Sequence, residues 1–414
     1  MHPTRRTLTA LLATTAAASL LRPKPVRAED RSVTIGITLP LTGAGAEDAV
    51  NVLHGAVLAI EEANAAGGPG GYHVRIETLD NATTTAGQYD PVQAAVNARK
   101  LVIDKTVVGA IGPMNSGSGK AMAAILSQAD LATVTPSSTN PDLTDPKFAA
   151  LYRPGGLPIY FRTVTTDSYQ GPNMANFMAE ELKIKSVFVL DDSGAYGVGI
   201  ADTFQARASK IGMTVLGRDR VDPMASDYSA LLTKVRSLNA QALYCGSSAL
   251  AGIKLVKQSY DILPNVVKAG GDGLHQASIL GGAGFPAAEG WYSTIAAPHM
   301  LDDKVMQPWI DRYVKRWGTP PADYSITAYD AAQVVLAAIA AVAKSGKPVA
   351  RAAVRDAIQV GRVKTLQGEL AFDPNGDLES HVVSVFQVRY DPKYPPTDIV
   401  HQFKFVGVAP ADNS

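Results

Sequence analysis

The sequence predicts an α/β fold with two lobes, each built around a mainly parallel sheet. From residue 33 onward, short runs rich in β-branched residues alternate with segments of helical period, a pattern typical of βαβ units. A stretch rich in proline and glycine, residues 152–158, separates two such series. The chain of 414 residues, 46% of them hydrophobic, has the composition of a soluble globular protein of about two or three domains.

The first series of elements predicts one lobe. Asp48 is a good N-cap residue for a helix that stops at the glycine-rich residues 67–70. Strands are expected at 33–39, 74–80, 107–111 and 132–134, and helices at 49–65, 91–105 and 117–129.

The second series predicts another lobe, followed by a return to helices. Strands are expected at 161–164, 187–190, 214–217, 242–245 and 266–269, and helices at 169–182, 197–211, 228–238 and 251–260. After an extended segment at 291–295, helices are expected at 304–317, 325–344 and 349–358, and extended segments at 369–372 and 382–390 around a turn at 373–376. Trp309, Tyr313 and Trp317 recur every four residues, which predicts a helix face packed in the core and not a ligand cage.

The first 28 residues read as an export signal. Arg5 and Arg6 form a twin-arginine pattern, and the apolar stretch 8–21 that follows is shorter than the ~20 residues that span a membrane. Val26-Arg27-Ala28 places small residues at a cleavage site. We therefore expect export to the periplasm with removal of the signal near Ala28.

Composition and motifs argue against several functions. Equal numbers of basic and acidic residues, 38 each, give no basic footprint for nucleic acid. The seven histidines have no zinc-ligand spacing, so no metal is expected. Gly119-Lys120 lacks the following Ser or Thr of a phosphate loop, and no nucleophile elbow occurs. The single cysteine, Cys245, is expected to be a buried inert thiol. We expect neither an enzyme nor a cofactor.

Two small polar loops follow predicted strands, where open α/β sheets bind ligands. Residues 112–119 contain Asn, Ser and Gly before a helix, and residues 135–141 contain Thr, Ser and Asn. Their hydroxyls and backbone N–H groups could hold a carboxylate without an arginine. The alternative is that these serines only cap helices.

With these loops in place, the chain resembles the periplasmic substrate-binding proteins of ABC importers for branched-chain amino acids, the Leu/Ile/Val-binding group of the type 1 periplasmic binding protein fold. The matching segments run in order along the chain: IGITLPLTG (35–43), HGAVLAIEEANAAGG (54–68), the loop 112–119, TPSSTNPDL (135–143), FRTVTTDSYQGP (161–172), DDSGAYGVG (191–199) and LQGELAFDPNGD (366–377).

The resemblance implies two Rossmann-like lobes joined by three crossover hinge strands, near 161–165, 291–296 and 372–375. The first lobe would comprise 29–160 and 297–371, the second 161–296 and 372–390, with a C-terminal segment at 391–414. A ligand would be trapped as the lobes close.

The resemblance also implies the binding residues. Ser116, Ser137, Ser138 and Thr139 would hold the carboxylate, Asp272 the ammonium, and Tyr196 would cover the ligand from the second lobe. Asp272 could instead only form a turn, and Tyr196 could only pack on its lobe. Asp48, besides its N-cap role, could supply an extra carboxylate to the ligand.

The expected function is capture of an amino acid or related small polar solute by a monomer, and its delivery to the permease and ATPase subunits of an ABC importer. A sensing module that signals to a membrane receptor, or a binder of amides or urea-like solutes, remains an alternative. Departures from the family pattern do not favour plain Leu/Ile/Val specificity: Thr83 and Asn115 replace a cysteine pair, Glu47-Asp48 replaces an aromatic, Ser247-Ser248 is small, and 145–158 looks like an insertion.

Overall fold

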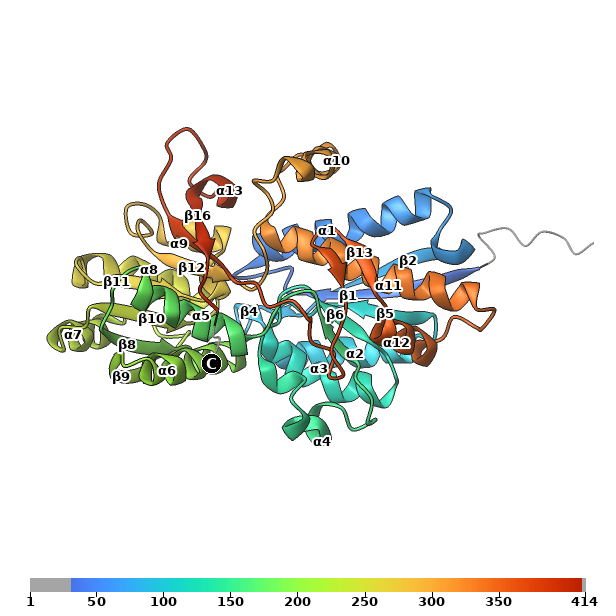
Figure 1. Cartoon of the computed structure of the whole chain (residues 1–414), viewed down its shortest axis with the longest axis horizontal. Helices are drawn as coiled ribbons and strands as arrows, with labels where there is room; N and C mark the ends of the chain where they lie inside the picture. The colour runs from blue at the N-terminus through green and yellow to red at the C-terminus, as the bar shows by residue number, and fades with distance from the viewer. Residues whose placement is uncertain (1–30, 412–414) are drawn as a thin grey trace, which may run out of the picture.

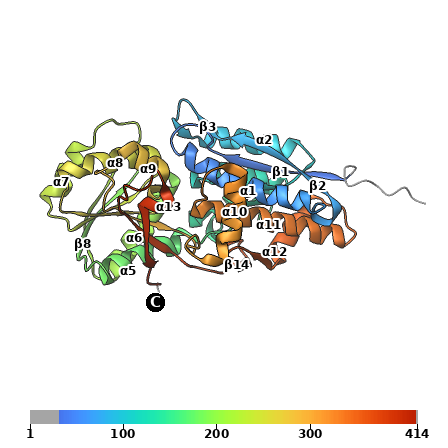
Figure 2. The same ribbon diagram turned by 90° about the horizontal axis from the view of Figure 1, so that it is seen from above.

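The computed structural model describes residues 31–411 and consists of two α/β lobes side by side (Figure 1). This confirms the predicted fold class. The predicted export signal at 1–28 lies outside the described residues. In the view from above, the chain runs from the first lobe into the second and back through narrow connections (Figure 2).

The first lobe has a five-stranded parallel sheet in the order β2-β1-β5-β6-β7. Its strands are β1 (Ser32–Leu39), β2 (His73–Asp80), β5 (Val107–Ile111), β6 (Thr133–Thr135) and β7 (Tyr160–Arg162). Its helices are α1 (Ala46–Ala65), α2 (Pro91–Ile103), α3 (Ser116–Gln128), α4 (Ala149–Tyr152), α10 (Gln307–Trp317), α11 (Asp323–Lys344) and α12 (Arg351–Val360). Two small hairpins, β3 (Ala82–Thr83) with β4 (Gln88–Tyr89) and β13 (Val363–Thr365) with β14 (Gly368–Leu370), complete it.

The second lobe has a seven-stranded sheet in the order β16-β15-β12-β11-β10-β8-β9, whose first two pairings are antiparallel. Its strands are β8 (Ser186–Asp191), β9 (Thr214–Arg220), β10 (Ala242–Gly246), β11 (Val267–Gly270), β12 (Tyr292–Ile295), β15 (Ser384–Val388) and β16 (Phe403–Val408). Its helices are α5 (Asp167–Glu180), α6 (Ala195–Lys210), α7 (Ser229–Ser237), α8 (Ala249–Ile262), α9 (Ala277–Ala283) and α13 (Ile399–Gln402). The edge strand β16 lies in the stretch 391–414, for which the sequence analysis predicted no strand.

The chain passes between the lobes three times, and each crossing lies later along the chain than predicted. Strand β7 pairs with β6, so residue 161 still belongs to the first lobe. Phe372 packs on Phe161 with ring centroids 5.2 Å apart, and Asp377 bonds to Arg162, so the predicted turn also stays on the first lobe. The crossings therefore lie near 163–166, 296–303 and 379–383.

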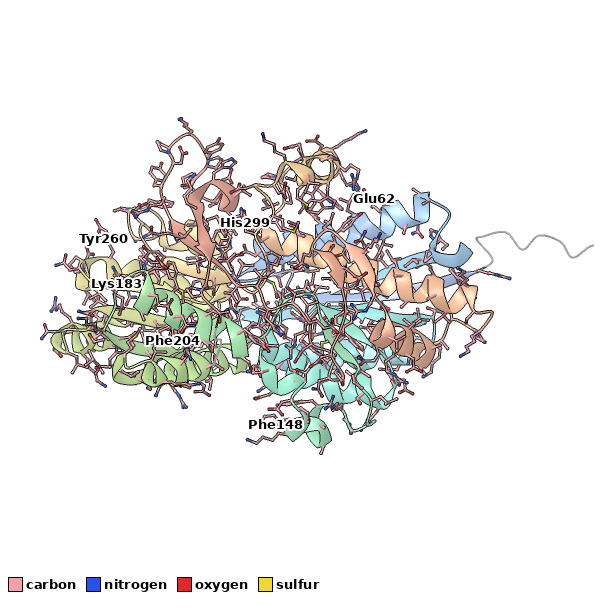
Figure 3. The ribbon with its side chains drawn as sticks, in the orientation of Figure 1. Glu62, Phe148, Lys183, Phe204, Tyr260 and His299 are labelled. Carbon is pink, nitrogen blue, oxygen red and sulfur yellow. The ribbon has the colours of Figure 1, made fainter. Side chains whose placement is uncertain are left out.

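The second crossing is tied to the first lobe by His299, which lies between the lobes in Figure 3. Its Nδ1 lies 2.7 Å from Oδ1 of Asp323, the first residue of α11. The ring stacks on Phe405 of β16 with centroids 5.0 Å apart. One histidine thus contacts both lobes at the hinge.

The core of the first lobe is built on the packing of α1 against α11. Helix α11 is long and apolar enough to cross a membrane, but 72% of its most apolar window is buried inside the lobe, as in the core helix of a soluble protein. Trp309 and Tyr313 of α10 are buried in the same cluster, as predicted, and Trp317 packs at its margin. The two helices are in close contact at Gly55, where a β-carbon would overlap the backbone carbonyl of Ser325.

We therefore expect Gly55→Ala to destabilise the first lobe by about 1–3 kcal/mol, because the backbone of α11 must move to admit the methyl group. Guanidinium unfolding followed by tryptophan fluorescence measures this. Glu61→Ala on the same helix removes only a half-exposed ion pair with Arg316 and should cost about 0–1 kcal/mol. Equal stability of Gly55→Ala and the parent would mean that α1 and α11 pack less tightly than described.

Candidate functional site

The carboxyl ends of strands from both sheets meet at a pocket between the lobes, the position that open α/β sheets use for ligands. The first lobe contributes Met114, Asn115, Ser116, Ser137 and Tyr324, and the second contributes Tyr196, Ser248, Asp272, Gly273 and Gln276. The cavity has a volume of about 20 Å³, which is room for one or two water molecules. The lobes are therefore close together here.

Two serine-bearing loops of the first lobe form one wall of the pocket. Ser116 is the first residue of α3, and residues 136–140 follow β6. Ser138 Oγ donates to Ser116 Oγ (3.4 Å), and the backbone N–H of Asn140 donates to the same oxygen (3.2 Å). Because Ser116 Oγ already accepts twice, its own proton is left to donate to a ligand.

The four predicted hydroxyl residues play unequal parts in this wall. Ser116 and Ser137 line the pocket, whereas Ser138 and Thr139 are buried residues outside its lining. The Ser137 hydroxyl donates to the backbone carbonyl of Met114 (3.1 Å). The alternative, that the serine of the first loop caps its helix, does not hold for Ser116, because its oxygen binds Asn140 instead.

The opposite wall centres on the Asp272 carboxylate, which is 6% exposed and accepts three hydrogen bonds. Oδ1 accepts from Gln170 Nε2 (3.0 Å) and the Tyr196 hydroxyl (2.7 Å), and Oδ2 accepts from the Tyr324 hydroxyl (2.6 Å). Burial raises the pKa of Asp272, and the three donors oppose that rise. A ligand cation beside this carboxylate would offset its desolvation.

Tyr196 and Asp272, predicted separately, lie in direct contact. Tyr196 is the second residue of α6, and its hydroxyl accepts from the Gly273 N–H (3.0 Å) while donating to Asp272. The tyrosine also belongs to the core of the second lobe. It therefore packs on its lobe and lines the pocket at once.

Sequence reasoning missed Tyr324 and Gln170. Tyr324 is the second residue of α11, so its hydroxyl crosses from the first lobe to a carboxylate of the second. Gln170, on α5, also accepts from the Thr294 hydroxyl (2.7 Å), which fixes its amide orientation. The only signal was that Gln170 falls within the family-like segment 161–172.

A second buried carboxyl lies close to the first. Asp167 begins α5, is fully buried, and accepts from the same Gln170 amide nitrogen at 3.0 Å. Burial, and next the negative charge of Asp272, raise the pKa of Asp167 to about 8. At neutral pH, Asp167 is therefore mostly protonated, and the three donors around Asp272, against the one on Asp167, favour a negative charge on Asp272.

Asp48 does not cap its own helix, because α1 begins at Ala46 after Gly45, whose φ of +85° places it in the left-handed region. Instead the Asp48 carboxylate reaches the other lobe. It accepts from the backbone N–H of Ala277 (2.8 Å) and the Ser278 hydroxyl (2.9 Å), at the N-terminus of α9. Burial raises the pKa of Asp48 to about 6. The predicted N-cap role is corrected: Asp48 caps a helix of the opposite lobe.

The arrangement suits a dipolar ligand with an acid end and a cationic end. Hydroxyl donors lie on the first lobe and a desolvated carboxylate on the second, across one cavity. Among residues 31–411, no group of three or more His, Cys, Asp or Glu residues is placed to hold a metal ion. Cys245 is buried on β10, and burial raises its thiol pKa, as expected for an inert cysteine.

Comparison with known proteins covers almost the whole described chain. The model of the periplasmic binding protein family matches residues 32–393. The Leu/Ile/Val-binding protein homolog 3 of Brucella melitensis is 32% identical over 86% of this chain and 91% of its own length. The Leu/Ile/Val-binding protein BraC3 of Rhizobium johnstonii is 31% identical over 86% of this chain and 91% of its own length. The solved leucine-binding protein LivK of Thermotoga maritima has a TM-score of 0.77 at 25% identity, over 91% and 98% of the two chains.

The buried pair of carboxyls predicts a distinct pH dependence of stability. The pKa of Asp167 is about 8 in the folded chain and 3.8 when hydrated, so the folded state holds the proton more tightly. Its contribution to the free energy of unfolding is therefore lost as pH rises from about 4 to about 8. The thermal midpoint of Asp167→Asn relative to the parent should increase steadily between about pH 5 and about pH 8.5.

Asp330→Asn provides the control for this titration. Asp330 is buried in the first lobe with a pKa of about 6. The difference in thermal midpoint between Asp330→Asn and the parent should therefore level off above about pH 7. A pH-independent difference for Asp167→Asn would contradict the assignment of a raised pKa to Asp167.

Proposed function

The chain belongs to the periplasmic binding protein family, and from this we propose that it captures an amino acid or a related small polar solute between its lobes for an ABC importer. Such proteins bind solutes and do not transform them, in agreement with the prediction that the chain is not an enzyme. The observation that carries the proposal is a cavity between the lobes that is lined by both a first-lobe hydroxyl, Ser116, and a second-lobe carboxylate, Asp272.

In the proposed complex, the acid end of the ligand lies against the first lobe. The proton of Ser116 and the N-terminus of α3, a helix of 13 residues, favour a carboxylate there. The ammonium lies against Asp272, where a charge-assisted pair forms out of water. Tyr196 and Tyr324 flank the ligand, one from each lobe.

The proposed ligand class is amino acids, which is supported by the relatives, two of which are Leu/Ile/Val-binding proteins by name. Asp48 lies in a second cavity that shares Met114, Gln276 and Tyr324 with the first. Since its carboxylate already binds α9, we assign Asp48 to drawing the lobes together beside the ligand. Ser138 and Thr139 support the wall on which Ser116 and Ser137 face the ligand.

The family is periplasmic, and we propose export through the twin-arginine signal with cleavage near Ala28. The loaded protein would act as a monomer and pass its ligand to permease and ATPase subunits. Mass spectrometry of ligand released from the purified protein, followed by calorimetry with the standard amino acids, tests the proposal. Binding of no amino acid, or release of a chemically altered compound after incubation, would overturn it.

Asp272→Asn should weaken binding of any ligand with a primary amine by about 2–4 kcal/mol, because a desolvated charge-assisted pair loses its charge. Calorimetry on the variant and the parent measures the difference. Asp219→Asn, which removes an exposed ion pair with Lys234 on the outer strand β9, is the control and should leave affinity unchanged. A loss below about 0.5 kcal/mol would place the ammonium elsewhere.

Tyr324→Phe should raise the dissociation rate about tenfold or more and leave the association rate within several-fold. The Tyr324 hydroxyl joins the lobes only after they close, so its loss affects ligand dissociation and not the initial association. Tyr313→Phe is the control, because the Tyr313 hydroxyl bonds within the first lobe, to Ser325 Oγ (3.3 Å). Stopped-flow fluorescence gives both rates, and a change confined to association would contradict closure about the ligand.

A further inference from the structure

Arg162 is a fully buried arginine beneath the hydroxyl-bearing wall of the pocket. It lies on β7, at the edge of the first sheet, and its side chain is 0% exposed. Its only ion-pair partner among the described residues is Asp377, whose Oδ1 accepts from Nε at 2.7 Å. A buried guanidinium is costly unless most of its donors are used.

The remaining donors of Arg162 hold the loop after β6. Nη1 donates to the backbone carbonyl of Ser138 (2.7 Å). Nη2 donates to the backbone carbonyl of Asn140 (2.9 Å) and to the Thr144 hydroxyl (2.8 Å). Four hydrogen bonds from one planar group therefore fix this loop and the start of the third crossing in a single geometry.

The two residues whose backbone carbonyls Arg162 binds, Ser138 and Asn140, also orient Ser116. Ser138 donates its hydroxyl, and Asn140 its backbone N–H, to Ser116 Oγ. Both contacts leave the Ser116 proton as the donor that faces the pocket. Asn140 also donates from Nδ2 to the carbonyl of Ala195 (2.7 Å), the residue before Tyr196, and so joins the lobes.

We infer that Arg162 is a positioning residue for the acid end of the ligand: through Ser138 and Asn140 it aims the Ser116 hydroxyl, an inference that rests on the proposed function. Lysine cannot replace it, because a single ammonium cannot reach two carbonyls, a hydroxyl and a carboxylate with fork geometry. Arg162 itself does not line the pocket.

A double-mutant cycle tests this coupling with the amino acid that binds the parent most tightly in calorimetry. Arg162→Lys and Ser116→Ala should each weaken binding about ten- to a hundredfold. In the Ser116→Ala background, Arg162→Lys should add less than about threefold, because the hydroxyl that it aims is already gone. Additive losses, or no loss for Arg162→Lys, would overturn the inference.

Arg355→Lys is the matched control for loss of a buried arginine. Arg355 lies on α12 of the first lobe, is 5% exposed, and pairs with Asp130 and Asp356 away from the cleft. We expect it to lower the thermal midpoint as Arg162→Lys does, but to leave affinity within about twofold. A matching loss of affinity in Arg355→Lys would show that general destabilisation explains the effect, and would overturn the positioning role.

A measurement without ligand separates this inference from the proposed function. If no amino acid binds the parent, the proposed function fails, and hydrogen exchange then decides the role of Arg162. Backbone amides of residues 136–144 should exchange at least about tenfold faster in Arg162→Lys than in the parent. Their exchange rates in Arg355→Lys should equal those of the parent. Unaltered exchange in this loop would overturn the positioning role by itself.

Discussion

The closed arrangement of the two lobes depends on satisfying the carboxylate of Asp272 away from water. A buried charge without partners would destabilise the structure by several kcal/mol, so each oxygen needs a donor. Two donors, Gln170 and Tyr196, come from its own lobe, and the third, Tyr324, comes from the other. The lobes therefore meet where a single charge requires groups from both, and the pocket between the lobes forms at that point.

The surrounding polar groups extend this constraint through the cleft. Gln170 bonds to both Asp167 and Asp272 through one nitrogen, while Thr294 fixes its oxygen. Because burial keeps Asp167 mostly protonated near neutral pH, the pair carries at most one negative charge. On the first lobe, the charge of Arg162 behind the serine loop is neutralised by Asp377, so that wall offers neutral donors. A wall of neutral donors thus faces a wall that carries a carboxylate, which suits a dipolar ligand.

Much of the fold follows from the sequence, whereas contacts between distant residues do not. The alternation of strands and helices predicted both lobes because each βα unit is a local pattern, and the burial of Cys245 followed from its strand. The edge strand β16 was missed because a short strand at a sheet edge depends on its pairing with β15. Tyr324 lies 52 residues from Asp272 along the chain, and no periodicity predicts a contact across a cleft. The local sequence predicted Asp48 as an N-cap of its own helix, but in the folded chain its carboxylate accepts a hydrogen bond from the first residue of α9.

Most of the hydrogen bonds that join the lobes run from a neutral donor to a carboxylate. This affects how a ligand controls closure. Tyr324 donates to Asp272 and the Ala277 N–H to Asp48, and neither donor carries a charge. Such bonds hold the lobes together weakly, because each donor could bond to water equally well in an open form. An ammonium beside Asp272 adds a charge-assisted pair that the open form cannot offer in the same desolvated setting. Since a ligand shifts an equilibrium only by its differential affinity for the two states, a cleft closed by weak neutral bonds responds strongly to a charged ligand.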